Sequence, residues 1–185
     1  MEGMKIMHND IKEILLTSEQ IESKAKELSE QLNKDYAEKK PILLGLLKGS
    51  IPFMGDLMKH MDIPAQMEFM DVSSYHGGVA SSGQVKIMKD MDTSVENRHV
   101  IIVEDIVDTG FTLSKVIDLL KHRGAETVEV VSMLDKPEGR IVDIKAKYVG
   151  FVIPKEFVVG YGLDYEEFYR NLPYVGILKE EIYTK

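Results

Sequence analysis

The chain has 185 residues, a formal net charge of −8 and no cysteine. One hydrophobic core suits this length, so we expect a single domain over residues 1–185, and the lack of thiols excludes disulfides and zinc–thiolate sites. The acidic balance disfavours extended contact with nucleic acid, and the lack of a signal-peptide core or a bilayer-length apolar run predicts a cytoplasmic protein without membrane contact.

Apolar residues recur in a pattern that alternates strands with helices, which is typical of an α/β fold. Residues 17–36 predict a helix, because Thr17 and Gln20 match a capping box and apolar side chains share one face. The apolar run 41–47 predicts a buried strand that turns through Lys48-Gly49-Ser50 into a helix over 52–60. Further strands are expected at 66–73, 85–88, 127–134, 147–153, 157–160 and 175–178.

Residues 74–83 are rich in glycine and serine, with Tyr75 near their start. Glycine adopts backbone conformations that other residues avoid, so this segment bends readily. The composition fits a mobile flap that closes over a site, and it also fits an ordinary long hairpin loop.

Residues 100–113 carry the strongest functional signal and read Val-Ile-Ile-Val-Glu-Asp-Ile-Val-Asp-Thr-Gly-Phe-Thr-Leu. The first four are β-branched and do not alternate with polar residues, which predicts a strand buried on both faces in a parallel sheet. Apolar residues then recur at helical spacing over 114–123, and Gly124 suits the position just after a helix end. The turn at 108–112 is therefore expected to open a helix.

A strand–turn–helix unit points free N–H groups and the positive end of the helix dipole at its turn, which favours phosphate. Gly110 lets the backbone come close to such a ligand, and two threonines add hydroxyl donors. Glu104, Asp105 and Asp108 add carboxylates, which suit sugar hydroxyls, Mg²⁺ or the removal of a proton. A phosphorylated sugar with magnesium satisfies all of these features.

Residues 104–112, an acidic pair and then Asp-Thr-Gly-Phe-Thr, resemble the phosphoribosyl-pyrophosphate (PRPP) signature of type I phosphoribosyltransferases. Residues 134–137 and 157–165, followed by Arg170, resemble the hypoxanthine-guanine phosphoribosyltransferase family. With Lys48, motifs of that family occur in order from about residue 41 to the C-terminus. The resemblance implies a type I fold, in which helices flank a mostly parallel central sheet and the N- and C-terminal segments form a small hood.

The resemblance also implies a purine salvage enzyme. Such an enzyme transfers the 5-phosphoribosyl group from PRPP to N9 of hypoxanthine or guanine, giving IMP or GMP and pyrophosphate, with Mg²⁺ as cofactor. Its partners would be these small-molecule substrates and further copies of itself, as a homodimer or homotetramer. The family also carries a cis peptide bond before the lysine of the pyrophosphate loop, which is expected here between Leu47 and Lys48.

The resemblance assigns roles residue by residue. Asp108 is expected to be catalytic, as the base that takes a proton from the purine, and Lys136 to donate to the exocyclic oxygen of a 6-oxopurine, a contact that adenine cannot make. PRPP and its phosphates are expected to bind Lys48, Gly49, Ser74, Tyr75, Glu104, Asp105, Asp108, Thr109, Gly110, Phe111, Thr112 and Arg170. The purine is expected to contact Lys136, Phe157, Val158 and Asp164, and the magnesium to bind Glu104, Asp105 and Asp164.

Each of these side chains also has an ordinary structural explanation, such as a core aromatic for Phe157, a cap for Asp164 or a surface ion pair for Arg170. Three other functions remain open at this point. A regulator that binds RNA on the same fold would need a basic face, which the acidic balance disfavours. A non-catalytic sensor of PRPP and a transferase that prefers xanthine are not distinguished by the sequence.

Overall fold

The computed structural model describes residues 6–74 and 85–184. Of the expected flap, Tyr75 and the residues up to 83 lie outside these ranges, and Ser74 is described only by its place at the end of a strand. The helices are α1 (Ile6–Asn9), α2 (Ser18–Asp35), α3 (Ile51–Lys59), α4 (Phe111–His122) and α5 (Glu180–Tyr183), with a 3-10 turn η2 (Pro137–Gly139). The strands are β1 (Ile11–Leu16), β2 (Ile42–Leu46), β3 (Gln66–Ser74), β4 (Val85–Lys89), β5 (His99–Val107), β6 (Thr127–Asp135), β7 (Tyr148–Val152), β8 (Val158–Val159) and β9 (Val175–Leu178).

Six strands form the main sheet, in the order β4-β3-β2-β5-β6-β7. The pairs from β3 to β7 are parallel, and β4 joins β3 in an antiparallel pair at the edge. This arrangement confirms the expected α/β fold with a mostly parallel sheet. The carboxyl ends of its parallel strands meet at one edge, where ligands bind in open α/β sheets.

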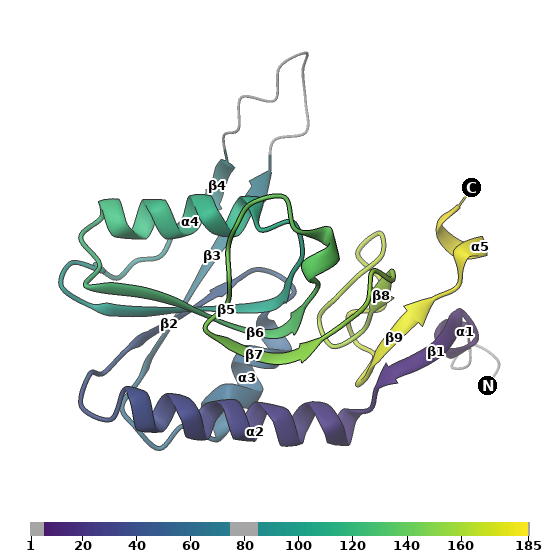
Figure 1. The fold of residues 1–185 in the computed structure, drawn as a ribbon, viewed down its shortest axis with the longest axis horizontal. Helices are drawn as coiled ribbons and strands as arrows, with labels where there is room; N and C mark the ends of the chain where they lie inside the picture. Colours follow the sequence, from purple (N-terminus) through teal and green to yellow (C-terminus); the bar gives the residue numbers. More distant parts are fainter. Residues whose placement is uncertain (1–5, 75–84, 185) are drawn as a thin grey trace, which may run out of the picture.

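Helices cover both faces of the main sheet, with α2 and α3 on one side and α4 on the other (Figure 1). Along β5, Ile101 and Val103 pack with α2 and α3, whereas Val100 and Ile102 pack with α4. Because both faces are buried, the strand contains apolar residues without polar alternation. The expected capping box of α2 is also present, since Thr17 and Gln20 exchange hydrogen bonds.

The turn between β5 and α4 differs in its boundaries from the sequence expectation. The strand β5 continues to Val107, so Glu104 and Asp105 lie on the strand rather than in a loop. The helix α4 begins at Phe111, within the turn that was expected to open it, because Gly110 adopts a left-handed conformation with φ of 77° and turns the chain into the helix directly. The β5–α4 turn is thus shorter and held at both ends by regular structure.

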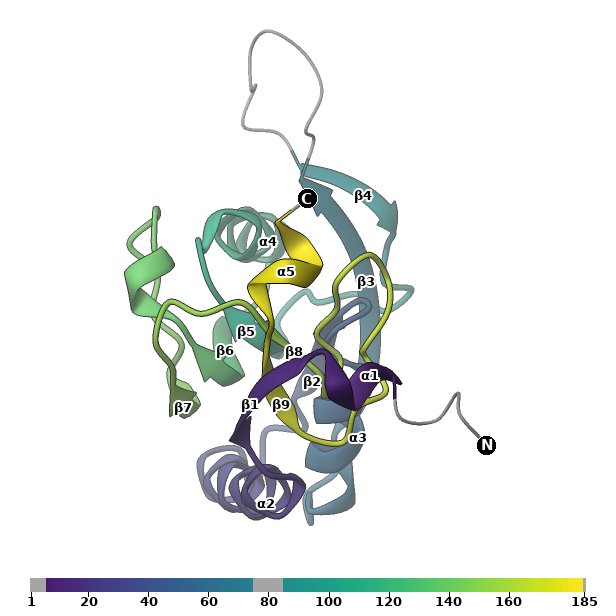
Figure 2. The same ribbon diagram turned by 90° about the vertical axis from the view of Figure 1, so that its right-hand side faces the viewer.

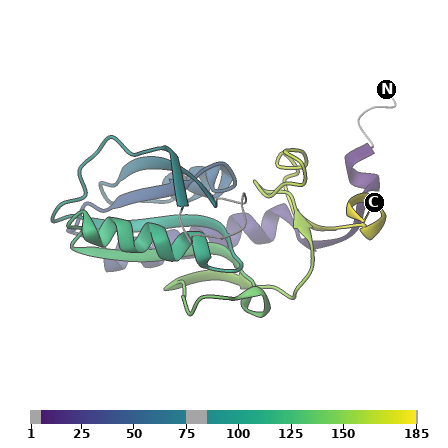
Figure 3. The same ribbon diagram turned by 90° about the horizontal axis from the view of Figure 1, so that it is seen from above.

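A second, antiparallel sheet has the order β1-β9-β8 and joins the two ends of the chain. With α1, α5 and the loop 160–174 it forms the hood, which lies beside the main sheet rather than on either face (Figures 2 and 3). The hood is formed by N- and C-terminal segments, as the resemblance implied. The strand β1 has no counterpart among the expected elements, because its pairing partner β9 is more than 150 residues away.

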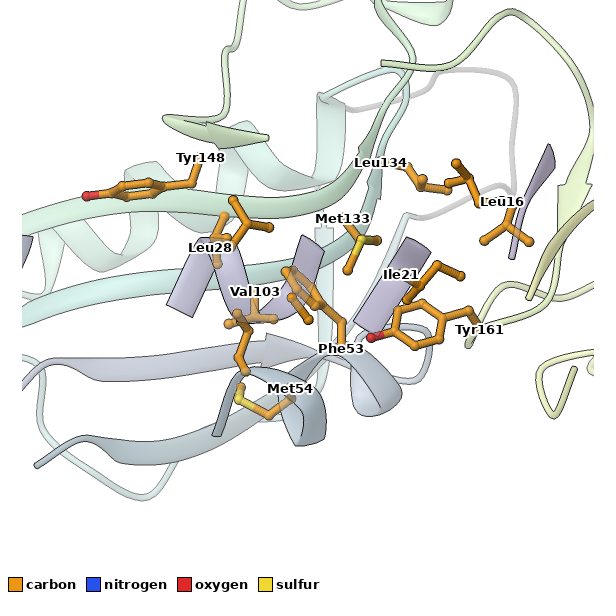
Figure 4. Close-up of a cluster of buried hydrophobic side chains, with 14 of the residues drawn as sticks. Leu16, Ile21, Leu28, Phe53, Met54, Val103, Met133, Leu134, Tyr148 and Tyr161 are labelled. Atoms are coloured by element: carbon orange, nitrogen blue, oxygen red, sulfur yellow. The ribbon is translucent and has the colours of Figure 1, made fainter. Parts of the chain in front are cut away.

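The hood shares its hydrophobic contacts with the main core. Tyr161 from the hood packs in the same buried cluster as Ile21 of α2 and Phe53 of α3 (Figure 4). Its hydroxyl donates a hydrogen bond of 2.6 Å to Asp56, and burial raises its pKa above the usual value. These contacts fix the base of the hood against the edge of the main sheet. Within residues 6–74 and 85–184, no helix combines the length and apolar character needed to span a bilayer.

Candidate active site between the sheet edge and the hood

The β5–α4 turn (residues 108–112) encloses a cavity of about 160 Å³, lined by Glu104 and by residues 106–113. The first N–H groups of a helix have no partner inside the helix, so at the start of α4 they depend on side chains, water or a ligand. Thr109 contributes a hydroxyl that accepts from the Phe111 N–H at 3.4 Å. The turn therefore has space and donors of the kind that an anion site needs.

Arg140 holds the backbone of this turn through hydrogen bonds and was not identified from the sequence. Its guanidinium donates to the carbonyl oxygens of Asp108 at 2.9 Å and Val107 at 3.1 Å. It also binds the Ile144 carbonyl and the Asp135 carboxylate, so one planar group connects four acceptors. The local sequence carries no signal for this role, because three of the acceptors are backbone carbonyls and the fourth is a carboxylate on another strand.

Asp108 and Lys136 form an ion pair, with 2.7 Å between Lys136 Nζ and Asp108 Oδ2. The lysine side chain is 14% exposed and the aspartate side chain 40% exposed. Gly139 lies so close that a Cβ there would be 1.8 Å from the other carboxylate oxygen. The residue expected to take a proton and the residue expected to select the base are therefore direct neighbours.

Glu104 and Asp105 are partly buried carboxyl groups on adjacent positions of β5. Burial, with a smaller effect from the charge of Asp105, raises the pKa of Glu104 well above its usual value. Burial also raises the pKa of Asp105 to about 6, although a hydrogen bond of 2.7 Å from the Ile106 N–H and the charge of Arg170 oppose the rise. Carboxyl groups perturbed in this way stabilise a bound cation or accept from hydroxyls strongly, and they cluster at functional sites.

The loop after β2 contacts both β5 and the hood. The peptide bond between Leu47 and Lys48 is cis, as expected from the family resemblance. A Cβ at Gly49 would lie 1.6 Å from Asp105 Oδ2, so only glycine permits this approach, and a Cβ at Gly162 would lie 2.0 Å from the Gly49 carbonyl oxygen. Lys48 is thereby brought to the edge where β5 ends.

Lys48 and Arg170, the two cations expected to bind pyrophosphate, share one carboxylate. Lys48 Nζ lies 2.6 Å from Glu167 Oε2, and Arg170 Nη2 lies 3.2 Å from Glu167 Oε1. Arg170 also contacts Asp164 at 2.9 Å and donates to the Gly162 carbonyl at 2.8 Å. The hydrogen bond from Lys48 holds the pKa of Glu167 below its usual range. Glu167 was not identified from the sequence, where it stands in a charged stretch of ordinary appearance.

Phe157, expected to stack on the purine, is 38% exposed. Tyr183 of α5 stacks on it with 4.8 Å between ring centroids, and Tyr165 meets it edge-on at 5.8 Å. Val158 follows in β8 and is buried. Tyr183 lies 26 positions further along the chain, and no sequence pattern connects the two rings.

Within the described parts of the chain, no three carboxylate, histidine or cysteine side chains lie close enough together to hold a metal by themselves. Mg²⁺ usually keeps several waters and binds one or two carboxylates together with substrate oxygens. The partly buried Asp105, with its raised pKa, and the Asp164 carboxylate near Arg170 fit that kind of site. Substrate oxygens would complete a site of this kind around the expected ligands Glu104, Asp105 and Asp164.

A larger cavity, of about 500 Å³, lies elsewhere, between α4, β6 and residues 142–145. Among the expected site residues whose side chains the structure describes, only Phe111 lines it. Its walls carry lysines and carboxylates in mixed order, without a dominant charge. The chemistry concentrates instead at the edge between the main sheet and the hood.

Comparison with known proteins agrees with this geometry. Residues 12–166 match the phosphoribosyl transferase domain family. This match spans most of the chain, and the parallel sheet, the carboxylates at its edge and the hood agree with it, so the chain is a phosphoribosyltransferase.

Relatives within that class are more specific. The hypoxanthine-guanine phosphoribosyltransferase of Streptococcus pyogenes is 57% identical over 180 residues, which cover 97% of this chain and 100% of the relative. The solved hypoxanthine phosphoribosyltransferase of Staphylococcus aureus is 55% identical, with a TM-score of 0.94 and full coverage of both chains. The Trypanosoma cruzi enzyme, solved as a mutant in a ternary substrates complex, is 40% identical with a TM-score of 0.89, over 95% of this chain and 99% of that one. The chain belongs to the hypoxanthine-guanine phosphoribosyltransferase family.

Proposed function

We propose that this site transfers the 5-phosphoribosyl group of PRPP, with Mg²⁺, to N9 of hypoxanthine and guanine and releases pyrophosphate. The enzyme acts in purine salvage, as its family does. The observation that carries the residue assignments is the meeting of the Asp108–Lys136 pair with an anion-binding turn at one sheet edge. The steps below follow from that arrangement.

The 5′-phosphate binds the N–H groups of residues 108–112 at the start of α4. The turn needs no reorganisation for this, because Arg140 and the backbone bonds from Ile141 and Val142 to the Thr109 carbonyl already fix it. The hydroxyls of Thr109 and Thr112 add donors. Anchoring the phosphate fixes the ribose above β5, where Glu104 and Asp105 accept from its hydroxyls.

Asp105, Glu104 and Asp164 would hold the magnesium, which when bound supplies positive charge to the departing pyrophosphate. Lys48 and Arg170 bind the same pyrophosphate, and the planar guanidinium suits two of its oxygens at once. Breaking the glycosidic bond leaves positive charge on the ribose, as in an oxocarbenium ion. The neighbouring carboxylates stabilise that charge.

The purine lies against the exposed surface of Phe157, with its edge read by the backbone of Val158. Lys136 donates to the exocyclic oxygen, which selects 6-oxopurines over adenine. Asp108 accepts the proton of the purine ring as N9 bonds to the ribose, and its ion pair with Lys136 holds the carboxylate in place for this task.

We also propose a homodimer or homotetramer. Ile51 at the start of α3 and Met67 on β3 are large apolar side chains that are about half exposed. Exposed apolar side chains favour association between copies. Light scattering during size-exclusion chromatography measures the mass of the assembly directly, and a monomer at micromolar concentration would contradict this part of the proposal.

The function is tested by incubating the enzyme with PRPP, Mg²⁺ and hypoxanthine, guanine, xanthine or adenine, and separating the nucleotides by chromatography. We expect IMP and GMP, with little product from adenine. Dominant turnover of xanthine would indicate the xanthine-preferring alternative. Binding of PRPP without turnover of any base would indicate a sensor and contradict the proposal.

A further inference from the structure

We propose that Glu167 is an internal competitor for the diphosphate of PRPP, binding Lys48 and Arg170 until the substrate displaces it. The inference rests on the proposed function, because it takes these two cations as the diphosphate ligands. Glu167 itself has no part in the proposed transfer. Its role is to set the affinity of the site for diphosphate groups.

The geometry of the carboxylate is the first observation. Glu167 directs one oxygen to each cation, at 2.6 Å from Lys48 Nζ and 3.2 Å from Arg170 Nη2. The two cations come from different regions, the loop after β2 and the hood, and the carboxylate connects them. An oxygen pair that bridges two cations occupies the same donors that a diphosphate oxygen pair requires. The two ligands therefore exclude each other.

The exposure of the contact is the second observation. The side chains of Lys48 and Glu167 are 58% and 62% exposed, so water and salt screen the pair. Exposed pairs of this kind change an equilibrium constant by only about two- to fivefold each. A ligand with several negative charges, assisted by Mg²⁺, displaces such a contact easily. The contact is thus weak enough to be exchanged in each reaction cycle.

The backbone around Glu167 is the third observation, because it holds the carboxylate in place without tying it to the core. Glu166 and Glu167 both have positive φ, of 51° and 71°. The turn is closed by bonds between Tyr165 and Phe168, and the Glu167 N–H donates to Asp164 at 2.9 Å. The backbone is fixed by these bonds, while the Glu167 side chain is free to rotate away.

Competition of this kind has a consequence at each end of the reaction. It weakens PRPP binding, and it speeds the loss of pyrophosphate because Glu167 returns to the two cations as the product leaves. A ligand that competes with an internal group has its affinity lowered by the fraction of sites left open. Removing the carboxylate charge is therefore expected to tighten diphosphate binding.

Glu167→Gln tests this inference, with Glu166→Gln as the matched control. Both changes remove one exposed carboxylate from adjacent residues with positive φ, but Glu166 makes no ion pair among the described residues. Titration calorimetry measures the Kd of magnesium pyrophosphate, and kinetics measures KM for PRPP and for hypoxanthine. We expect Glu167→Gln to lower the Kd and the PRPP KM by about three- to tenfold, and Glu166→Gln to change neither.

A purely structural role for Glu167 predicts the opposite sign, since loosening the turn would raise the Kd. An unchanged or raised Kd in Glu167→Gln, or an equal fall in Glu166→Gln, overturns the inference. Glu167→Ala repeats the test should the glutamine variant be unstable. Pyrophosphate binding does not require turnover, so a wild-type protein that binds it without forming IMP would contradict the proposed function and leave this inference standing.

Discussion

Asp108 and Glu167 each pair with a cation of the site, but their surroundings differ. Asp108, in a turn whose backbone is held by Arg140, pairs with Lys136, whose side chain is 14% exposed. Glu167, on an exposed turn of the hood, pairs with Lys48, whose side chain is 58% exposed. The Asp108–Lys136 ion pair is therefore part of a fixed arrangement at the sheet edge, whereas we propose that the Glu167–Lys48 ion pair is exchanged during the reaction.

This difference suits two separate tasks, phosphate anchoring at the sheet edge and pyrophosphate exchange at the hood. In the proposed reaction the β5–α4 turn binds the 5′-phosphate, which both PRPP and the product nucleotide carry, so a preorganised site loses nothing by being rigid. In the same proposal, Lys48 and the hood residue Arg170 bind the pyrophosphate, which must leave in each cycle. Five predictions follow this contrast from the largest expected effect to the smallest.

Replacing the proposed base has the largest effect. Asp108→Asn keeps the shape of the side chain but cannot accept the proton, so we expect turnover to fall by at least about 10²-fold. PRPP binding should change little, because the phosphate donors are backbone groups. Rapid-quench kinetics and calorimetry measure the two quantities, and near-normal turnover would remove Asp108 from the role of base.

Lys136→Ala tests the Asp108–Lys136 pair through the selectivity between hypoxanthine and adenine. The variant loses the donor for the exocyclic oxygen, so the preference for hypoxanthine over adenine, as a ratio of kcat/KM, should fall by about tenfold or more. Turnover of hypoxanthine should also fall, since Asp108 loses its partner. Unchanged selectivity would indicate that another donor reads the base.

Arg140→Lys tests whether the hydrogen bonds from Arg140 to the β5–α4 turn are needed for PRPP binding. A lysine cannot reach four acceptors with planar geometry, so we expect the PRPP KM to rise by about fivefold and the free energy of unfolding to fall by about 1–3 kcal/mol. Arg123→Lys is the matched control, because Arg123 binds Asp90 through two nitrogens at the other end of α4. Equal effects on KM in both variants would show that Arg140 does not act on the turn.

The buried carboxyl group of Asp105 predicts a pH dependence of stability. Its pKa of about 6 in the folded chain exceeds its usual value, so the folded state holds the proton more tightly than the unfolded state does. The free energy of unfolding should therefore decrease as pH rises from about 4 to 6, by on the order of 1–3 kcal/mol.

Urea denaturation across this pH range measures the effect. Asp105→Asn removes the titrating group and should flatten the decline, although Glu104, whose pKa is also raised, keeps part of it. Asp92→Asn, which removes an exposed carboxylate, should leave the decline unchanged. An identical slope in wild type and Asp105→Asn would contradict the assignment.

Tyr183→Leu gives the smallest effect and tests the hood. Without the stacked ring, Phe157 is held less firmly against the purine, so the KM for hypoxanthine should rise about two- to fivefold. The KM for PRPP should remain as in wild type. A lower KM for hypoxanthine would instead mean that Tyr183 covers the face that the purine needs.

The sheet side of this contrast was largely predictable from the sequence. Residues 100–103 indicated a doubly buried strand, Thr17 and Gln20 a helix start, and Gly110 the turn, because each signal is local. The turn at 108–112 was expected to open a helix, and α4 begins there at Phe111, before the apolar spacing of residues 114–123.

The remaining features depend on contacts between distant segments. The strand β1 pairs with β9 from the other end of the chain, Arg140 binds backbone oxygens, and Tyr183 meets Phe157 across the hood. None of these partners is encoded in a spacing or a period. Glu167 was missed for the same reason, because its two cations lie in separate loops.

A crystal structure with Mg²⁺, hypoxanthine and an unreactive PRPP analogue tests the central contrast most directly. The account predicts that the β5–α4 turn and its bonds to Arg140 stay as they are, that the purine lies between Phe157 and Lys136, and that the diphosphate replaces Glu167 on Lys48 and Arg170. A diphosphate bound elsewhere while Glu167 keeps both cations, or a β5–α4 turn that rearranges to accept the phosphate, would contradict it.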